Sequence, residues 1–228
     1  MNKIINIISL FAVTVYTIIV FGNIYDFSFS TFHFRGLGLK DEILAAIAVL
    51  VALLGMIRIL RRWQGVKDMK NFKSFTFKTK LSKEMFSEAI LHSSLEILFI
   101  IGFIVLLGFF TSIEFYNGIH MLVVMLIILV DALLFFFRRL RNDDVFSIGI
   151  NKDIVAYFNR EMKIYYFTGL QRIEIHHGLI HLQYKKDLNL FIPTSAIPKA
   201  ERENFRDQLI ATLENRNIFI DEEFRKWH

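Results

Sequence analysis

Residues 43–83 read ILAAIAVLVALLGMIRILRRWQGVKDMKNFKSFTFKTKLSK, and this stretch decides the fold. Residues 43–60 are apolar apart from Arg58. At about 1.5 Å per residue, an α-helix of this length crosses most of a hydrocarbon core of about 30 Å. Residues 61–83 are rich in Lys and Arg, which mark the cytoplasmic side of a membrane span. The stretch therefore predicts a transmembrane helix that ends in the cytoplasm.

Three further apolar runs have about the same length, and they cover residues 4–21, 89–110 and 119–137. The chain therefore predicts a membrane α-helical protein with four transmembrane helices, arranged as one hairpin in residues 1–62 and a second in residues 84–138. A mean hydropathy of +0.43 is too high for an ordinary soluble domain and agrees with this class.

The distribution of Lys and Arg around these runs predicts the topology. Nine basic residues lie between the second and third runs, counted from Arg58 to Lys83, and three arginines directly follow the fourth run. By contrast, residues 22–41 contain two basic residues and residues 111–118 contain none. Because basic residues stay on the cytoplasmic side, both termini are expected in the cytoplasm.

The net charge of +5 comes from residues beside the membrane. Residues 58–83 contain nine basic residues and one acidic residue, whereas residues 142–228 contain 12 basic and 13 acidic residues. This pattern predicts contact with the anionic headgroups of the membrane lipid bilayer and argues against a nucleic-acid partner. The residues expected at the headgroups are Arg61, Arg62, Lys67, Lys70, Lys73, Arg139 and Arg141.

The chain contains no cysteine, which excludes disulfides, thiolate metal ligands and a cysteine nucleophile. The sequence also lacks a P-loop, a GxSxG nucleophile motif, an HExxH zinc motif and a Gly-rich phosphate cradle. We therefore expect no enzymatic activity and no cofactor.

The basic connection, residues 63–83, contains a strand pattern. Between residues 74 and 81, Phe75, Phe77 and Leu81 alternate with polar residues, which predicts a half-buried strand. Ser82 is a suitable N-cap, so a helix should begin at Lys83 and run unbroken into the third span.

Residues 142–228 predict a small β-rich cytoplasmic domain. Short β-branched or aromatic runs alternate there with polar turns, which is typical of an all-β domain. The period then changes, and Phe205, Leu209 and Leu213 form one apolar stripe on a helix predicted at residues 198–215. The apolar tail after residue 217 is expected either to pack on the sheet or to touch lipid.

This order of elements resembles the YcxB-like bacterial membrane proteins. The resemblance covers about residues 74–216 and is carried by the segment FTFKTKLSKE at residues 75–84, by Phe191-Ile192-Pro193, and by Phe205 and Leu209. The chain differs from the simplest form of the family in two additional spans at its start and in Thr194, which stands where a basic residue is expected. The resemblance implies a pleckstrin-homology-like (PH-like) cytoplasmic domain, a bacterial cytoplasmic (inner) membrane location, and a binding or scaffolding role.

Two acidic residues lie inside the predicted spans. A carboxylate deep in a membrane costs about 2.5–3.5 kcal/mol on insertion scales, so it normally faces a partner or water. In a hairpin folded near residue 115, Asp131 lies within one turn of Glu96, and Arg58 and Arg138 can extend towards both. We therefore expect an intramembrane charge cluster, either as a structural salt bridge or as a protonatable functional pair.

A metal site is the weaker interpretation of the same region. Glu84, Glu88, His92 and Glu96 are spaced four residues apart on one helix face, and Glu88, His92 and Glu96 have ligand types suited to a divalent cation. Such a site needs a ligand from another helix, so none is expected. The histidines at 176, 177 and 181 fall on adjacent predicted strands, where at most two can converge.

Two function classes follow. The first is a non-enzymatic membrane protein that presents a PH-like domain to a protein or lipid partner, or to a second copy of itself. The alternative is a small transporter, or a proton- or ion-handling protein, that uses Glu96, Asp131 and His92.

Overall fold

The computed structural model describes residues 2–25, 28–29, 32–33, 39–72, 74–113, 115–141, 144–185 and 188–228. Lys73, one of the residues predicted at the headgroups, lies outside this set. The chain forms two compact units. The helical unit comprises Met1–Arg61 and Ser93–Phe137, and the sheet unit comprises Arg62–His92 and Arg138–His228.

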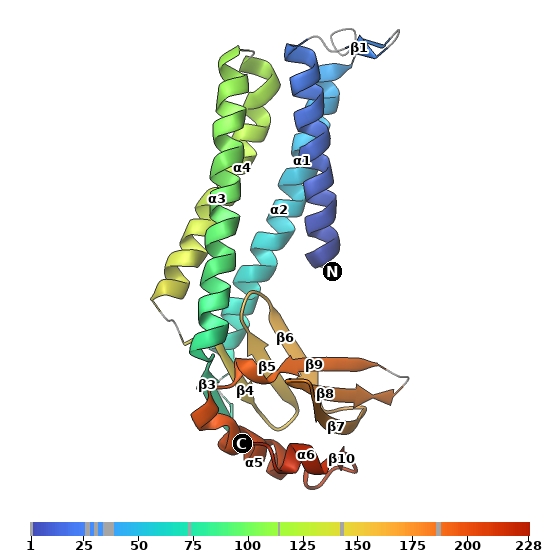
Figure 1. The fold of residues 1–228 in the computed structure, drawn as a ribbon, viewed down its shortest axis with the longest axis vertical. Helices are drawn as coiled ribbons and strands as arrows, with labels where there is room; N and C mark the ends of the chain where they lie inside the picture. The colour runs from blue at the N-terminus through green and yellow to red at the C-terminus, as the bar shows by residue number, and fades with distance from the viewer. Residues whose placement is uncertain are drawn as a thin grey trace. The chain divides into compact units, whose positions relative to one another are not determined.

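Four long helices contain the four predicted spans (Figure 1). They are α1 (Asn2–Ile24), α2 (Lys40–Asn71), α3 (Lys83–Ile113) and α4 (Phe115–Leu140). Each is long and apolar enough to cross a membrane, so the prediction of four such helices is confirmed. Between α1 and α2, β1 (Ser28–Phe29) pairs with β2 (Phe32–His33) in an antiparallel ladder.

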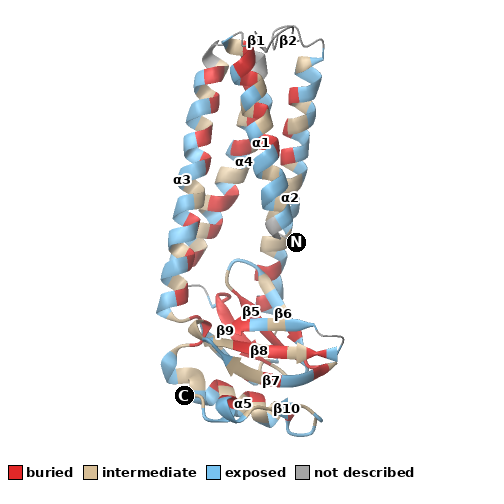
Figure 2. Ribbon diagram, turned by 45° about the vertical axis from the view of Figure 1, so that its right-hand side comes forward, coloured by how far each residue is buried: buried red, intermediate tan, exposed pale blue. Residues whose placement is uncertain are grey.

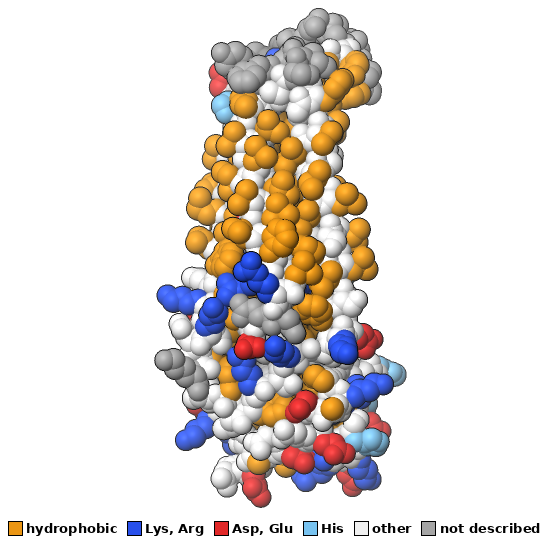
Figure 3. Space-filling view, turned by 90° about the vertical axis from the view of Figure 1, so that its left-hand side faces the viewer, with side chains coloured by type: hydrophobic (Ala, Val, Ile, Leu, Met, Phe, Trp, Pro, Cys, Tyr) orange, Lys and Arg blue, Asp and Glu red, His pale blue; other side chains and the backbone are white. Residues whose placement is uncertain are grey.

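The helical unit has a continuous apolar core and an apolar exterior. Tyr16 of α1, Val51 of α2, Leu107 of α3 and Met121 of α4 are all at most 2% exposed and belong to one cluster. Figure 3 shows hydrophobic side chains over the visible outer face of these helices, and Figure 2 shows buried and exposed positions alternating along them. An exterior this apolar is suited to lipid and not to water.

The helices extend further than the apolar runs. α2 continues to Asn71, so the first part of the predicted basic connection, residues 63–71, is helical. Val66 and Met69 lie one turn apart on a buried helix face, and this burial stabilises a stretch that hydropathy alone assigns to a linker. At the start of α3, the backbone N–H of Met85 donates to Ser82 Oγ at 3.1 Å, so the predicted N-cap is confirmed.

The first sheet of the sheet unit has the strand order β3-β4-β5-β6. Its strands are β3 (Phe77–Lys80), β4 (Ser147–Ile150), β5 (Ile154–Phe158) and β6 (Met162–Tyr166), and all neighbours are antiparallel. β3 is shorter than the predicted strand at residues 74–81, and its whole length pairs with β4. The α3–α4 hairpin is therefore inserted between two neighbouring strands of one sheet.

The second sheet has the strand order β10-β7-β8-β9. β7 (Leu170–His176), β8 (Leu179–Tyr184) and β9 (Asn189–Pro193) form an antiparallel meander. β10 (Phe219–Ile220) comes from the tail and pairs parallel to β7. The short helix α6 (Glu222–Arg225) follows, and its Phe224 is fully buried, so the tail packs within the sheet unit.

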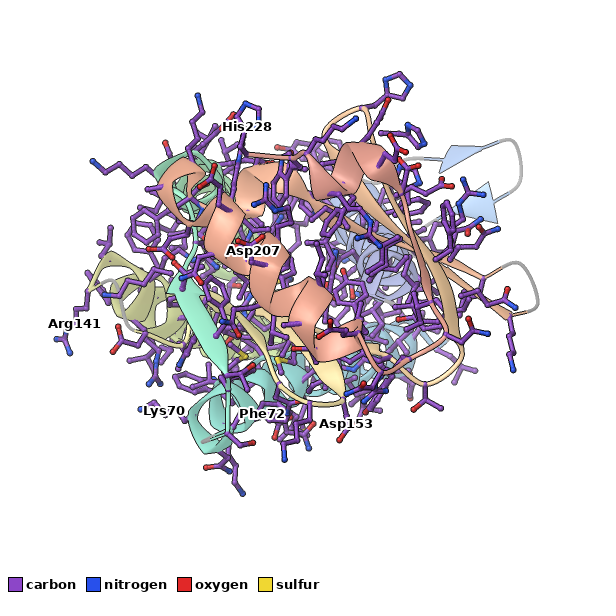
Figure 4. All side chains as sticks on the ribbon, turned by 90° about the horizontal axis from the view of Figure 1, so that it is seen from below. Lys70, Phe72, Arg141, Asp153, Asp207 and His228 are labelled. Carbon is purple, nitrogen blue, oxygen red and sulfur yellow. The ribbon has the colours of Figure 1, made fainter. Side chains whose placement is uncertain are left out.

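Helix α5 (Arg202–Leu213) closes the sheet unit, and it directly follows a 3-10 turn at Lys199–Glu201. Phe205, Leu209 and Leu213 are buried, which confirms the predicted apolar stripe. In the end-on view of Figure 4, α5 crosses in front of the strands, and Asp207 lies on its outer side. Ile148, Val155 and Ile173 are fully buried, and Figure 2 shows β5 in the colour of buried residues.

Candidate functional site

An ion pair lies inside the helical unit. Arg58 of α2 donates through Nη2 to Glu96 Oε1 of α3, and the two side chains are 31% and 16% exposed. The predicted contact between these residues is therefore present. Because a charged hydrogen bond of this type neutralises a carboxylate that is costly in hydrocarbon, the pair links two spans at low cost in insertion free energy.

Asp131 of α4 is the second acid within a predicted span. It is 8% exposed, so its side chain is covered by protein, as the sequence predicts. The other two predicted members of the charge cluster, Arg138 and His92, belong to the sheet unit. Arg138 lies over the ring of Trp63, with 5.6 Å from the guanidinium carbon to the ring centroid. His92 is 3.7 Å from Glu88 on the exposed face of α3.

The structure does not assemble the metal-ligand set considered for α3. Among the described residues, no group of three or more His, Cys, Asp or Glu side chains lies close enough to hold a metal ion. Glu88 and His92 pair with each other, whereas Glu96 is bonded to Arg58. A spacing of four residues places these side chains on one helix face, but Glu96 points to Arg58 while Glu88 and His92 point to each other.

The basic residues predicted at the headgroups divide into two groups. Lys67, Lys70 and Arg141 are exposed, and Arg61 and Arg62 are half-buried. Figure 4 shows Lys70 and Arg141 at the periphery of the end-on view. These five positions are compatible with headgroup contact.

Arg139 is also predicted at the headgroups, but its side chain is only 1% exposed, so this prediction is wrong. Its Nη1 donates to Asn159 Oδ1 at 2.8 Å, its Nη2 donates to the Asn159 carbonyl, and its guanidinium carbon lies 4.6 Å from the ring centroid of Phe146. A guanidinium enclosed in this way cannot reach a lipid phosphate. Its position beside the apolar run suggested lipid contact, but the turn after β5 folds over it.

The outward face of the second sheet carries a polar and aromatic cluster, which we call the outer sheet face. Strand register places Glu174 of β7 opposite His181 of β8, and His181 opposite Phe191 of β9. The alternate residues Ile173, Ile180 and Ile192 point inwards and are fully buried. The residues of this face that concern us are Arg172, Glu174, His176, His181, Gln183, Phe191 and Phe219.

Side chains on the outer sheet face contact one another in sequence. Arg172 pairs with Glu174, and its guanidinium carbon lies 4.8 Å from the centroid of the Phe219 ring. Glu174 Oε2 is 3.4 Å from His176 Nε2, and the ring centroids of His176 and His181 are 5.7 Å apart. These charges are held in fixed positions on a rigid sheet, which suits recognition of a partner.

His181 occupies the centre of this face. Its ring meets Phe191 edge to face with 4.7 Å between centroids, and its Nε2 is enclosed without a hydrogen-bond partner among the described residues. His177 instead occupies the β7–β8 turn with a φ of 51°. The prediction that at most two of the three histidines converge is therefore confirmed, because the turn separates His177 from the other two.

Sequence reasoning missed Glu174, Phe191 and Phe219 as members of one surface. The alternation within residues 170–176 and 179–184 shows which side chains share a strand face, but it does not show which strands are neighbours. The parallel addition of β10 has no clear local signal, because two residues are too few for a period.

Buried tyrosine hydroxyls connect parts of the sheet unit. Tyr165 of β6 donates to the carbonyl of Phe191 in β9 at 2.8 Å, which joins the first sheet to the second. Burial raises the pKa of the Tyr157, Tyr165 and Tyr184 hydroxyls. All three hydroxyls are therefore neutral at physiological pH and not activated nucleophiles.

Comparison of the chain with protein-family models, with curated proteins and with solved structures gave no match.

Proposed function

We propose that this protein is a YcxB-like, multi-pass protein of the bacterial cytoplasmic membrane, and that its sheet unit is a PH-like module that binds a protein partner in the cytoplasm. The observation that carries the binding role is the outer sheet face, where charged and aromatic side chains are held in fixed register. The role is non-enzymatic.

The topology of the sheet unit supports the PH-like assignment. An antiparallel meander of four strands, β3 to β6, is followed by a meander of three, β7 to β9, and then by the closing helix α5. This is the order of elements that the resemblance implies. The membrane hairpin occupies the connection between the first two strands.

The chemistry of the outer sheet face favours a protein over a lipid headgroup. Anionic headgroups are recognised by clusters of basic residues, whereas this face alternates Arg172 with Glu174 and has Glu223 3.9 Å from His176. Mixed charges of this kind give specificity towards a protein surface. Phe191 and Phe219 are 44% and 57% exposed, and exposed aromatic residues are common anchors of protein interfaces.

The basic residues beside the spans have a separate role in this proposal. Five of them contact anionic headgroups and keep these helix ends on the cytoplasmic side of the membrane: Arg61, Arg62, Lys67, Lys70 and Arg141. The membrane therefore orients the module, and the outer sheet face selects its partner.

Site-specific photo-crosslinking in intact cells tests the binding role. A benzophenone amino acid replaces Phe191 or Phe219 in the full-length protein, and Ala211, exposed on α5, is the matched control position. We expect a discrete protein adduct at 191 and 219 that is absent at 211 and is lost with Glu174→Lys. A lipid adduct alone assigns the face to lipid, and equal labelling at all three positions contradicts the proposal.

Asp131 supports a second candidate function, proton or ion handling, because an acid that is 8% exposed within a membrane span is an unusual feature. In that function Glu96, Asp131 and His92 transfer the ion. The Arg58–Glu96 pair favours a structural role for these charges, since a carboxylate held by a guanidinium is poorly placed to exchange a proton. The outcome for Asp131→Asn, given below, separates the two roles.

A further inference from the structure

Asn159 lies between β5 and β6, and two of the long helices bond to it. Arg139, near the end of α4, donates to both the side-chain oxygen and the carbonyl of this residue. Asn159 Nδ2 in turn donates to the sulfur of Met85, near the start of α3, at 3.2 Å. Arg139 and Met85 are 1% and 7% exposed, so both contacts are enclosed.

Helix α2 also packs against the β5–β6 turn. A Cβ atom built on Gly65 of α2 would lie 2.6 Å from Phe158 and 3.2 Å from Met162, so the helix backbone rests directly against the residues that flank the turn. Trp63 on the same helix contacts Arg138 of α4. Within the sheet unit, α2, α3 and α4 therefore each have a residue that contacts the segment 158–162.

These three helices continue without a break from the helical unit into the sheet unit. We propose that Asn159 is the hub of a relay that couples the packing of α3 and α4 to the conformation of the β5–β6 turn, while α2 packs directly beside that turn. The relay acts along the chain and does not depend on the identity of any bound partner.

The contacts have the properties that a relay requires. A buried guanidinium without acceptors costs free energy. Arg139 and Asn159 therefore either move together or lose both hydrogen bonds at once. The forked geometry of arginine fixes direction as well as distance, because two nitrogens bond to one residue. Close packing of α2 against Phe158 transmits a small displacement where a loose contact would absorb it.

Hydrogen–deuterium exchange on the full-length protein in lipid nanodiscs tests the relay. Arg58→Leu disturbs the helical unit, and Glu96→Gln is a second way to break the same ion pair. We expect either change to speed amide exchange in residues 158–162 by about tenfold or more, because the turn opens locally. Protection in β7–β9 should not change, which shows that the sheet unit stays folded.

The hub is tested by repeating the measurement in an Asn159→Ala background, where Glu96→Gln, on α3, should add no further change at the turn. Asn151→Ala is the matched control, since Asn151 caps the β4–β5 turn through its side chain and the response should persist there. If Asn159→Ala also removes protection from β7–β9, Met85→Leu replaces it, because this change removes the sulfur that accepts from Asn159 and Tyr157 and so breaks the contact with α3. The relay is overturned if exchange in residues 158–162 does not change in either span variant, or if the response to Glu96→Gln survives in the Asn159→Ala or replacement Met85→Leu background.

Discussion

The rings of Phe77 and Phe205 meet edge to face with 5.8 Å between their centroids, although one precedes the α3–α4 hairpin and the other lies on α5. Both side chains are buried, at 7% and 0% exposure. The core of the sheet unit is therefore assembled from chain on both sides of the α3–α4 hairpin. A segment before the hairpin and a segment after it must meet for this core to form.

We expect Phe77→Asp to destabilise the sheet unit by about 3–5 kcal/mol, because it places a charge against Phe205 and removes a large apolar side chain. Lys78→Ala, on the exposed side of the same strand, should change stability by less than about 0.5 kcal/mol. Denaturant unfolding of the full-length protein measures both. A fragment of residues 142–228 that is as stable without residues 74–81 as with them contradicts this role for β3.

The charge asymmetry predicts that Lys70 and Lys185 face the cytoplasm. Since the chain has no native cysteine, single Cys substitutions at these positions can be labelled without background. A membrane-impermeant maleimide should leave both unlabelled in intact cells and label both after permeabilisation. Leu39→Cys, exposed before α2, is the positive control and should react in intact cells. Reaction at 70 or 185 before permeabilisation reverses the topology.

The intramembrane charges predict an order of effects. Asp131→Asn should be mild, because a neutral amide costs less to bury than a carboxylate. Arg58→Leu should cost about 3–5 kcal/mol, because it leaves Glu96 without its guanidinium partner. Thermal unfolding in detergent measures stability, and dye-loaded vesicles measure proton flux. If Asp131→Asn instead abolishes a flux that the native protein carries, while abundance and unfolding stay normal, ion handling is the function.

Two helical glycines differ in what surrounds them. Gly65→Ala should destabilise the sheet unit by about 1–3 kcal/mol, because the new Cβ would overlap the Phe158 ring. Gly102→Ala in α3 should stabilise by about 0.5–1 kcal/mol, since nothing lies within 4 Å of its Cβ position and alanine favours the helix. Equal effects of the two substitutions on thermal unfolding argue against close packing of α2 on β5.

Buried tyrosines predict sensitivity to alkaline conditions. Burial raises the pKa of the Tyr165 hydroxyl above its ordinary value of 10.0. The folded state therefore holds this proton more tightly, so the contribution is complete below pH 10 and is lost as the pH rises above that value. Tyr165→Phe should lower stability at pH 7, because the carbonyl of Phe191 loses its donor, yet its unfolding temperature should fall less between pH 9 and pH 11. Parallel curves for the two proteins would show that Tyr165 does not titrate in this way.

Much of the architecture follows from local properties of the chain. Hydropathy locates the four long helices because transfer of each apolar residue into hydrocarbon is favourable whatever its neighbours. Alternation locates β3, and the period of four places Phe205, Leu209 and Leu213 on one buried face. The pairing of Arg58 with Glu96 also follows from the sequence, because a charge in a span requires a partner and few are within reach.

The tertiary structure alone decided three features: the burial of Arg139 against Asn159, the extension of α2 to Asn71, and the assembly of Glu174, His181 and Phe191 into one face. Each depends on contacts between residues distant in the chain. Hydropathy and periodicity describe what a side chain prefers, but strand register and helix packing determine which neighbour it receives, and these are set only when the whole core forms.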